Sequence, residues 1–385
     1  MRVYADNNAT TRVADEVMAA MLPFFTEKYA NPSSMYAFAL EAKRPMEEAR
    51  EQVAGLINAA HADEIIFTSC GTESDNAAIF GVLEAQPRKR HVIMSAVEHP
   101  AVYNLTETLR RHGVRVTHLS VNGEGLVDVE ELRHVLSDDT ALVSVMWANN
   151  ETGVLSPMEE ICGVAHERGV IVHTDAVQAV GKVPVDVQKV PVDLLSLSGH
   201  KFHAPKGVGA LYVKRGTRLR PFFVGGHQEH GRRAGTENVP SIVGLGKAAE
   251  LAQKFLGDEV TRVRGLRDRF EREILARVPY TRVNGHRTLR TPNTTSISFA
   301  YVEGEAILLS LSDEGICASS GSACTSGSLE PSHVLRAMGL SHAEAHGTVR
   351  FSFSRYTTDA EIDYMLERIP PVIARLRELS PFYPG

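Results

Sequence analysis

The sequence predicts an α/β fold, with a large domain on a mostly parallel seven-stranded sheet and a smaller α+β domain after it. Short β-branched apolar runs alternate with amphipathic helical stretches from about residue 63 to residue 215. A strongly charged helical stretch follows at 258–280 and marks a boundary. With 385 residues, the chain is longer than one hydrophobic core usually fills, so two domains are expected.

The predicted strands of the large domain alternate with helices along the chain. The strands are Glu64–Thr68, His91–Ser95, Arg115–Leu119, Ala141–Ala148, Val170–Thr174, Asp193–Ser198 and Gly209–Lys214. The helices between them are Ser74–Glu84, Ala101–His112, Val129–Val135 and Met158–Arg168. Apolar strands joined by crossover helices are typical of a parallel sheet that is covered on both faces.

The rest of the chain predicts a smaller domain with fewer elements. Its elements are Thr295–Tyr301, Glu305–Leu311, Thr348–Ser354 and a closing helix at Asp359–Leu379. We expect a large domain over 13–257 and a small domain formed by 1–12 and 258–385. The small domain would carry a cysteine segment at about 317–333.

Composition argues against several kinds of partner. The net charge of −6 argues against nucleic acid or an anionic membrane surface. No apolar run reaches the ~18 residues that span a bilayer, and the first residues lack the apolar stretch of a signal peptide. Four cysteines in so long a chain do not make a disulfide framework, and free thiols fit a reducing compartment. We therefore expect a cytoplasmic protein.

Cys324 lies in a segment made almost entirely of small residues, since 315–332 read GICASSGSACTSGSLEPS. A structural cysteine usually lies among apolar side chains, whereas a reactive one is accessible and forms a thiolate. The segment fits a mobile strip that carries a nucleophile, and it equally fits a solvated linker in which the cysteine is incidental.

Polar clusters follow five of the predicted strands, at the edge where ligands bind in open α/β sheets. The clusters are Ser69-Cys70-Gly71-Thr72-Glu73, Glu98-His99-Pro100, Asn149-Asn150-Glu151-Thr152-Gly153, Asp175-Ala176-Val177-Gln178 and Gly199-His200-Lys201. Packing alone does not explain such a convergence, so we predict a binding site at this edge.

The residue types at this edge fit pyridoxal phosphate. Gly71 and Thr72 at a helix start offer backbone N–H groups and a hydroxyl to a phosphate. Lys201 can form a Schiff base, and Asp175 on a neighbouring strand can keep a pyridine nitrogen protonated. His99 can stack on the ring and move protons, since the pKa of histidine lies near neutrality. Taken alone, Thr72 would be interpreted as a helix cap and Lys201 as a surface lysine. Asp175 and Lys201 both follow the C-terminal ends of adjacent predicted strands, and such a pair is hard to explain by chance.

Other motifs do not indicate a function. Gly244–Lys247 lacks the spacing and the hydroxyl of a P-loop, and no Gly-x-Gly-x-x-Gly follows the first strand. His200-x-x-His203 and His227-x-x-His230 have the spacing of metal ligands but no Cys-x-x-Cys partner. We therefore expect no intrinsic metal.

Motifs along nearly the whole chain resemble those of NifS-type cysteine desulfurases, which are fold type I pyridoxal phosphate enzymes of the class-V aminotransferase family. Besides the clusters above, the motifs are Tyr4–Thr11, the residues Ser198 to Lys201, Gly231–Thr236 and the segment around Cys324. The long cysteine segment resembles the first group of this family. Tyr36 and Ala39 depart from the family pattern, which has His and Gly at these positions.

The resemblance implies a role for each site residue. Lys201 would bind pyridoxal 5'-phosphate as a Schiff base, with Asp175 at the pyridine nitrogen and His99 on the ring. Arg350 would bind the carboxylate of the substrate, L-cysteine, and Asn150 would also touch the substrate. The other cofactor contacts would be Gly71, Thr72, Ser198 and His200 at the phosphate, Gln178 and Asn150 at the ring oxygen, and Thr236 at the phosphate of the partner subunit. The last contact implies an obligate homodimer.

The implied reaction removes sulfur from L-cysteine. After a proton leaves the α-carbon, the Cys324 thiolate would attack the substrate sulfur, which leaves a persulfide on Cys324 and releases alanine. An iron–sulfur scaffold would accept the sulfur, and Cys324 could transiently share a cluster with it as a ligand. The chain stops soon after Leu379, without the longer tail of housekeeping relatives, so we expect a scaffold of nitrogen fixation. The alternatives are another fold type I enzyme, such as an aminotransferase or a selenocysteine lyase, and a non-enzymatic sulfur carrier.

Overall fold

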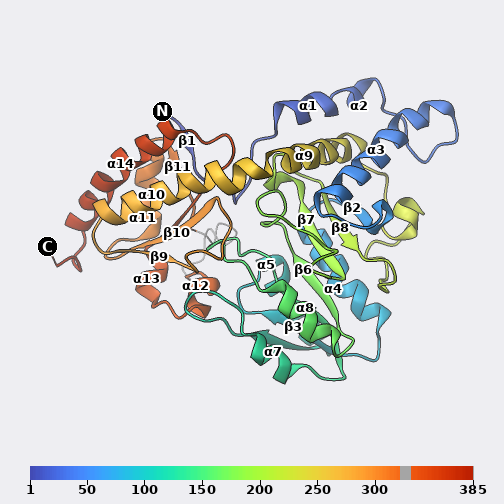
Figure 1. The fold of residues 1–385 in the computed structure, drawn as a ribbon, viewed down its shortest axis with the longest axis horizontal. Helices are drawn as coiled ribbons and strands as arrows, with labels where there is room; N and C mark the ends of the chain where they lie inside the picture. Colours follow the sequence, from blue (N-terminus) through green and yellow to red (C-terminus); the bar gives the residue numbers. More distant parts are fainter. Residues whose placement is uncertain (321–330, 385) are drawn as a thin grey trace.

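The computed structural model describes residues 1–320 and 331–384. Its central element is a seven-stranded sheet with the strand order β2-β8-β7-β6-β5-β3-β4 (Figure 1). The strands are β2 (Ile65–Thr68), β3 (His91–Ser95), β4 (Arg115–Leu119), β5 (Thr140–Ser144), β6 (Ile171–Asp175), β7 (Leu194–Ser198) and β8 (Gly209–Val213). Only β8 runs antiparallel to its neighbours in this sheet. The predicted α/β class and the mostly parallel sheet are confirmed.

Both faces of the sheet are covered by helices, so alternate strand residues enter two apolar clusters. Ile65, Phe67 and Ile93 pack in one cluster, and Ile66 and Met94 pack in the other. The first cluster includes residues of α1 (Asp15–Met21), α3 (Ala37–Leu56), α7 (Val129–Val135), α8 (Met158–His166) and α9 (Val239–Asp258). The second includes residues of α4 (Gly71–Ala85), α5 (Pro100–Tyr103) and α6 (Leu105–Arg111). This double burial explains why the strands are apolar on both sides.

A smaller lobe holds both ends of the chain (Figure 1). Its antiparallel sheet has the order β12-β10-β9, and a short parallel pair joins β1 to β11. The elements are β1 (Val3–Tyr4), β9 (Thr281–Asn284), β10 (Thr294–Phe299), α11 (Gly304–Asp313), β11 (Ile316–Cys317), α12 (His333–Ala337), α13 (His342–His346), β12 (Thr348–Ser352) and α14 (Asp359–Glu378). Val3 and Ala5 share a buried cluster with residues from Val263 to Ile373. This cluster supports the proposed division at 1–12 and 258–385, which stays a prediction.

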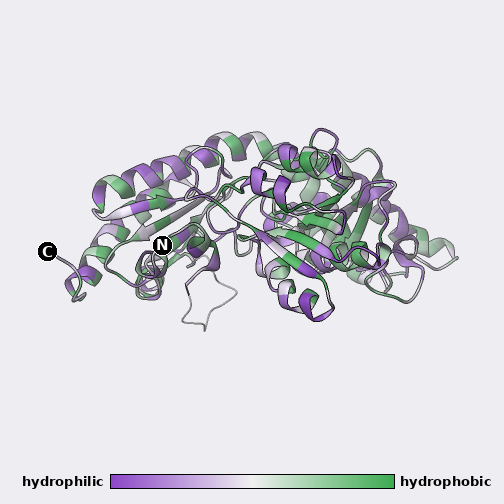
Figure 2. Cartoon of the chain, turned by 90° about the horizontal axis from the view of Figure 1, so that it is seen from below, coloured by the Kyte–Doolittle hydropathy of each residue, from purple (hydrophilic) through white to green (hydrophobic). Residues whose placement is uncertain are grey.

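One long helical rod connects the two lobes (Figure 1). It consists of α9, a π-helical turn at Glu259–Val263 and α10 (Arg264–Arg277). The sequence predicted a separate helix at 258–280, but no proline or capping glycine interrupts the chain there, so the helix continues through the junction. Figure 2 shows hydrophobic strands inside the large lobe and helices with hydrophilic residues toward the outside.

Two predicted elements differ from the structure for local reasons. The helix expected at 101–112 is divided into α5 and α6, because Asn104 ends the first and begins the second. The strand expected to reach Ala148 ends at Ser144. Past that point the backbone N–H of Met146 donates to the carboxylate of Glu98 at 2.8 Å instead of to a neighbouring strand. Among the described residues, no helix has both the length and the apolar character that a membrane span requires.

Candidate active site

The polar clusters predicted to converge do line one cavity of about 290 Å³. It lies past the carboxyl ends of β2, β3, β5, β6 and β7, where open α/β sheets bind ligands. The predicted residues that line it are Gly71, Thr72, His99, Asn150, Asp175, Gln178, Ser198, His200, Lys201 and Arg350. Asn8, Ala9, Cys70, Asp75, Met146 and Val177 line it as well.

The start of α4 forms one end of the cavity. Cys70 is the N-cap of this helix, and its Sγ accepts from the backbone N–H of Glu73 at 3.5 Å. A Cβ on Gly71 would lie 2.8 Å from Cγ2 of Val177, so only glycine fits this close approach. The Oγ of Ser198 is buried and has no hydrogen-bond partner among the described residues. A phosphate at this helix start would supply one.

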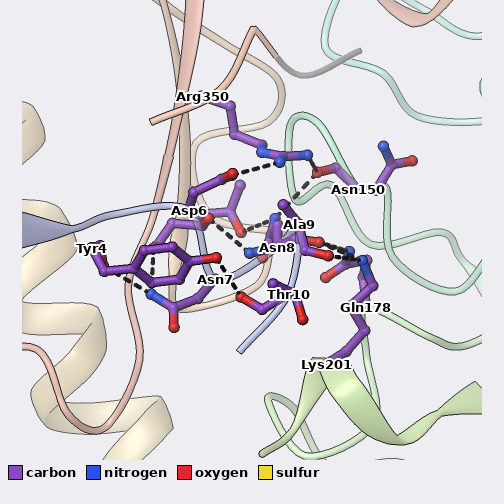
Figure 3. Close-up of polar contacts among 12 residues, drawn as sticks. Tyr4, Asp6, Asn7, Asn8, Ala9, Thr10, Asn150, Gln178, Lys201 and Arg350 are labelled. Atoms are coloured by element: carbon purple, nitrogen blue, oxygen red, sulfur yellow. Dashed lines mark hydrogen bonds and ion pairs between the residues drawn. The ribbon is translucent and has the colours of Figure 1, made fainter. Parts of the chain in front are cut away.

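Lys201 and Asp175 face the middle of the cavity. Lys201 ends a 3₁₀ turn that follows β7, and its Nζ donates to the carbonyl oxygens of Asn8 at 2.6 Å and Ala9 at 2.9 Å (Figure 3). Asp175 is the last residue of β6, and its Oδ1 accepts from the N–H of Val177 at 2.9 Å. Burial raises the pKa of Asp175 to about 6, although the ammonium of Lys201 acts in the opposite direction. A protonated ring nitrogen would therefore be a favourable partner for this carboxylate.

His99 is neutral at pH 7. It caps α5, and its Nδ1 accepts from the N–H of Ala101 at 3.1 Å, which leaves the ring proton on Nε2. Burial lowers the pKa of His99 to about 4, and the positive charge of Lys201 adds to the effect. The pKa near neutrality that was expected for His99 is therefore wrong, because burial of the ring disfavours its charged form.

Arg350 enters the cavity from the small lobe. On β12, its guanidinium donates to Oδ1 of Asp6 and to the carbonyl oxygen of Asn150, both at 2.9 Å (Figure 3). The buried Oδ1 of Asn150 has no hydrogen-bond partner among the described residues. The cavity is thus completed by side chains of both lobes.

Two predicted site residues are not placed in this cavity. Thr236 is exposed in the loop before α9 and does not line it. Cys324 lies outside the described residues, so its proposed role stays a prediction. The described residues on either side of 321–330 contact Arg350, which lines the cavity, and Glu151, which follows the lining residue Asn150. Ser319 pairs through its backbone with Arg350, and Ser332 Oγ donates to the carboxylate of Glu151 at 2.6 Å.

Three polar residues of the site, Asn8, Lys182 and Asp75, had not been predicted, and Glu98 had been named only as a member of its cluster. Asn8 and Lys182 contact Lys201 or its neighbours, and Asp75 and Glu98 are fully buried carboxyls beside the cavity. Burial raises the pKa of Asp75 well above its usual range, and it raises the pKa of Glu98 to about 8. Two features of the sequence could have indicated Asn8 and Lys182. Asn8 ends a run of three polar residues, Asp6-Asn7-Asn8, after an apolar strand, and Lys182 is an isolated lysine in an apolar stretch.

Comparison with known proteins agrees with this geometry. The family model of aminotransferase class-V matches residues 3–365. Cysteine desulfurase 2 of Trichormus variabilis is 60% identical over 380 residues, which cover 99% of this chain and 95% of that protein. Cysteine desulfurase NifS of Azotobacter vinelandii is 57% identical over 383 residues, which cover 100% of this chain and 95% of that protein.

Solved structures share the fold over the whole chain. A NifS-like protein superposes with a TM-score of 0.92 at 40% identity and covers 98% of this chain and 100% of its own. A NifS-like protein from Rickettsia africae has a TM-score of 0.88 at 29% identity, over 97% of this chain and 100% of its own. The chain therefore belongs to the class-V aminotransferase family and, within it, to the NifS-type cysteine desulfurases.

Proposed function

We propose that the protein uses pyridoxal 5'-phosphate to remove sulfur from L-cysteine, forming alanine and a persulfide on Cys324. One observation carries the proposal. Lys201, Asp175 and the glycine-led start of α4 meet in one cavity, in the arrangement that this cofactor needs. The buried oxygens of Ser198 and Asn150 have no hydrogen-bond partner among the described residues, and a ligand in this cavity would remove the free-energy cost of leaving them unpaired.

Different residues would bind the phosphate, the ring nitrogen and the ring oxygen of the cofactor. Gly71, Thr72, Ser198 and His200 would hold the phosphate, with Thr236 added from the partner subunit. Asp175 would hold the ring nitrogen, and Gln178 and Asn150 the ring oxygen, with His99 against the ring. When bound through Lys201, the cofactor supplies an electron sink for the pair left at the substrate α-carbon.

Substrate binding would depend on Arg350 and Asn150. A guanidinium binds a carboxylate through two parallel hydrogen bonds, which fixes the direction of the amino acid. Asp6 already holds one end of this guanidinium, so the substrate would meet a side chain whose direction is set. Lys201 Nζ would take the α-proton, and neutral His99 would offer the proton on its Nε2.

Sulfur transfer would depend on Cys324. Its thiolate would attack the substrate sulfur, forming the S–S bond while the C–S bond breaks. The electron pair of that bond stays on the substrate carbon and is protonated, so that alanine is released. The described residues on both sides of the cysteine segment contact Arg350 of the cavity and Glu151, the neighbour of the cavity residue Asn150, which supports this role.

A homodimer is the assembly that we propose. Large apolar side chains lie exposed in the region from α1 to α3 and again at Phe223 and Val224, of which Val224 is 90% exposed. Exposed apolar groups of this kind are typical of protein interfaces. Thr236 follows Phe223 and Val224 closely in the sequence. A partner subunit that packs against these two residues would therefore bring its own cavity close to Thr236.

The sulfur acceptor that we propose is an iron–sulfur scaffold, and the role in nitrogen fixation follows the resemblance to NifS. The scaffold and Cys324 could transiently share a cluster. We place the reaction in the cytoplasm, where thiols stay reduced. The three described cysteines, Cys70, Cys162 and Cys317, are free thiols in agreement with this.

The test is Cys324→Ser, assayed with L-cysteine against Cys317→Ser as the matched control. We expect Cys324→Ser to keep the change in visible absorbance when substrate binds but to lose alanine formation by at least about a hundredfold. Cys317→Ser should keep both. Alanine formation at the wild-type rate in Cys324→Ser would contradict the proposal and would indicate a lyase that does not need this cysteine.

A further inference from the structure

A second lysine, Lys182, lies buried beside Lys201, and no part of the proposed reaction uses it. It follows β6 in the turn after Gln178, and only 5% of its surface is exposed. Buried lysines are rare unless their ammonium group has partners. The contacts of Lys182 therefore indicate what it does.

The ammonium of Lys182 donates to two amide side chains of the site. Its Nζ lies 3.1 Å from Oδ1 of Asn8, and it also donates to Oε1 of Gln178. Asn8 in turn accepts from Lys201 Nζ at 2.6 Å and from Gln178 Nε2 at 3.0 Å through its backbone carbonyl (Figure 3). Lys182 thus contacts the side-chain oxygen of Asn8, and Lys201 contacts its backbone oxygen.

These contacts, together with Nδ2 of Asn293, which donates to Oδ1 of Asn8 at 3.0 Å, decide which way both amides point. A lysine nitrogen held by two oxygen acceptors acts as a donor, so the side-chain oxygens of Asn8 and Gln178 must face Lys182. The amide nitrogen of Gln178 then faces Asn8 and the cavity, where a ring oxygen would need a donor. The amide nitrogen of Asn8 faces the carbonyl of Asn150, at 3.2 Å, and the hydroxyl of Thr294, at 2.9 Å.

The surroundings of Lys182 leave it few other partners. A cavity of about 10 Å³ separates it from Lys201 and Glu259, which is room for roughly one water molecule. Glu259 opens the π-helical turn between the lobes and accepts from the N–H of Arg355 at 3.2 Å. Burial lowers the pKa of Lys182 to about 7 and raises the pKa of Glu259 to about 7. The cavity therefore leaves room for no more than about one water molecule in place of the amide contacts if the lysine is lost.

We propose that Lys182 is a positioning residue, which sets the amide orientation of Asn8 and Gln178 and thereby the side of the Gln178 amide that donates toward the cofactor. This inference rests on the proposed function, because it assigns the cavity to pyridoxal phosphate. It adds a residue that acts through others and touches neither the cofactor nor the substrate.

The first test compares Lys182→Met with Lys189→Met, an exposed lysine that follows the same strand. Apo protein is titrated with pyridoxal phosphate, and the visible spectrum of the loaded protein is recorded. We expect Lys182→Met to weaken cofactor affinity about tenfold and to shift the visible band, because the hydrogen bonds that orient both amides are lost. Lys189→Met should match the wild type. Wild-type affinity and an unshifted band in Lys182→Met would overturn the inference.

A second pair of variants separates positioning from charge and from folding. Glu259→Gln removes the neighbouring carboxylate but keeps the contacts of Lys182, so cofactor affinity should stay within about twofold of the wild type. Lys182→Met combined with Glu259→Gln avoids an unpaired buried carboxylate and should reproduce the spectral shift of Lys182→Met. A lower melting temperature of the apo protein without a spectral shift would indicate a merely structural lysine and overturn the inference.

A double-mutant cycle shows whether Lys182 acts through Gln178. The effect of Lys182→Met on cofactor affinity should be at least halved in a Gln178→Ala background, because the amide that it orients is absent. Equal effects in both backgrounds would contradict the inference. If wild-type apo protein failed to bind pyridoxal phosphate at all, the proposed function would fall instead.

Discussion

Burial, more than neighbouring charge, sets the protonation of single residues around the cavity. It is the largest cause of the lowered pKa of His99 and Lys182 and of the raised pKa of Asp175 and Glu98. The charged form of each group is the one that burial disfavours. Without a ligand, His99 and Glu98 are therefore uncharged at pH 7.

Glu98 provides a prediction at this scale. Its pKa is raised from 4.5 to about 8, so the folded protein binds more protons than the unfolded chain between these values. The free energy of unfolding must then fall as pH rises through this window, by at most ~1.4 kcal/mol per unit from this group. Glu98→Gln lacks the titration and keeps an acceptor for Ser95 and Met146. We expect its stability relative to wild type to increase steadily from pH 5 to about pH 8.

Urea denaturation of the apo protein at several pH values measures this difference. Glu48→Gln, an exposed position on α3, is the matched control and should show a difference from wild type that does not change with pH. A constant difference for Glu98→Gln as well would show that Glu98 ionises normally in the folded protein.

At the scale of elements, features that local sequence patterns define were predicted correctly, and features that depend on contacts between distant residues were not. The bounds of β3, β4 and α7 were predicted correctly, because apolar periodicity and turn residues define them locally. The site edge was predictable for the same reason, since its residues directly follow strands. The positions of Asn8 and Lys182 in the site were not predictable, because they depend on a contact between residues that are 174 positions apart in the sequence. The pKa of His99 was misjudged because burial is a property of the folded chain.

Gly71 provides a prediction at the start of α4. Gly71→Ala would place a methyl group 2.8 Å from Cγ2 of Val177 at the proposed phosphate end, so the helix start must shift. We expect a loss of cofactor affinity of about tenfold or more, measured by titrating apo protein with pyridoxal phosphate.

The matched control is Gly163→Ala on α8, where no heavy atom lies within 4 Å of the added carbon. This change should leave affinity unaltered and raise stability by up to ~1 kcal/mol, because alanine is the better helix former. Equal affinities for both variants would show that the start of α4 does not bind the phosphate.

At the scale of the whole molecule, ion pairs fix the loop that carries Thr236, although Thr236 does not line the cavity of its own subunit. Glu229 is buried, and it accepts two hydrogen bonds from the guanidinium of Arg50, at 2.7 and 2.9 Å. Arg233 pairs with Glu73 of α4 at 2.8 Å, which ties the loop to the proposed phosphate end. A loop fixed in this way can present Thr236 to a second subunit in a defined position.

Mixed dimers test whether Thr236 completes the partner's site. Lys201→Ala should abolish desulfurase activity, and Thr236→Val should lower cofactor affinity about tenfold, as expected for a lost hydrogen bond to a charged group. In a dimer with one subunit of each variant, purified through two different tags, the Thr236→Val subunit keeps Lys201 and receives Thr236 from its partner. That dimer should show about half of the wild-type activity at a limiting cofactor concentration, as should the control dimer of wild type and Lys201→Ala. If Thr236 acted within its own subunit, the mixed dimer would contain no complete site, and its activity would stay at the level of Thr236→Val alone or below.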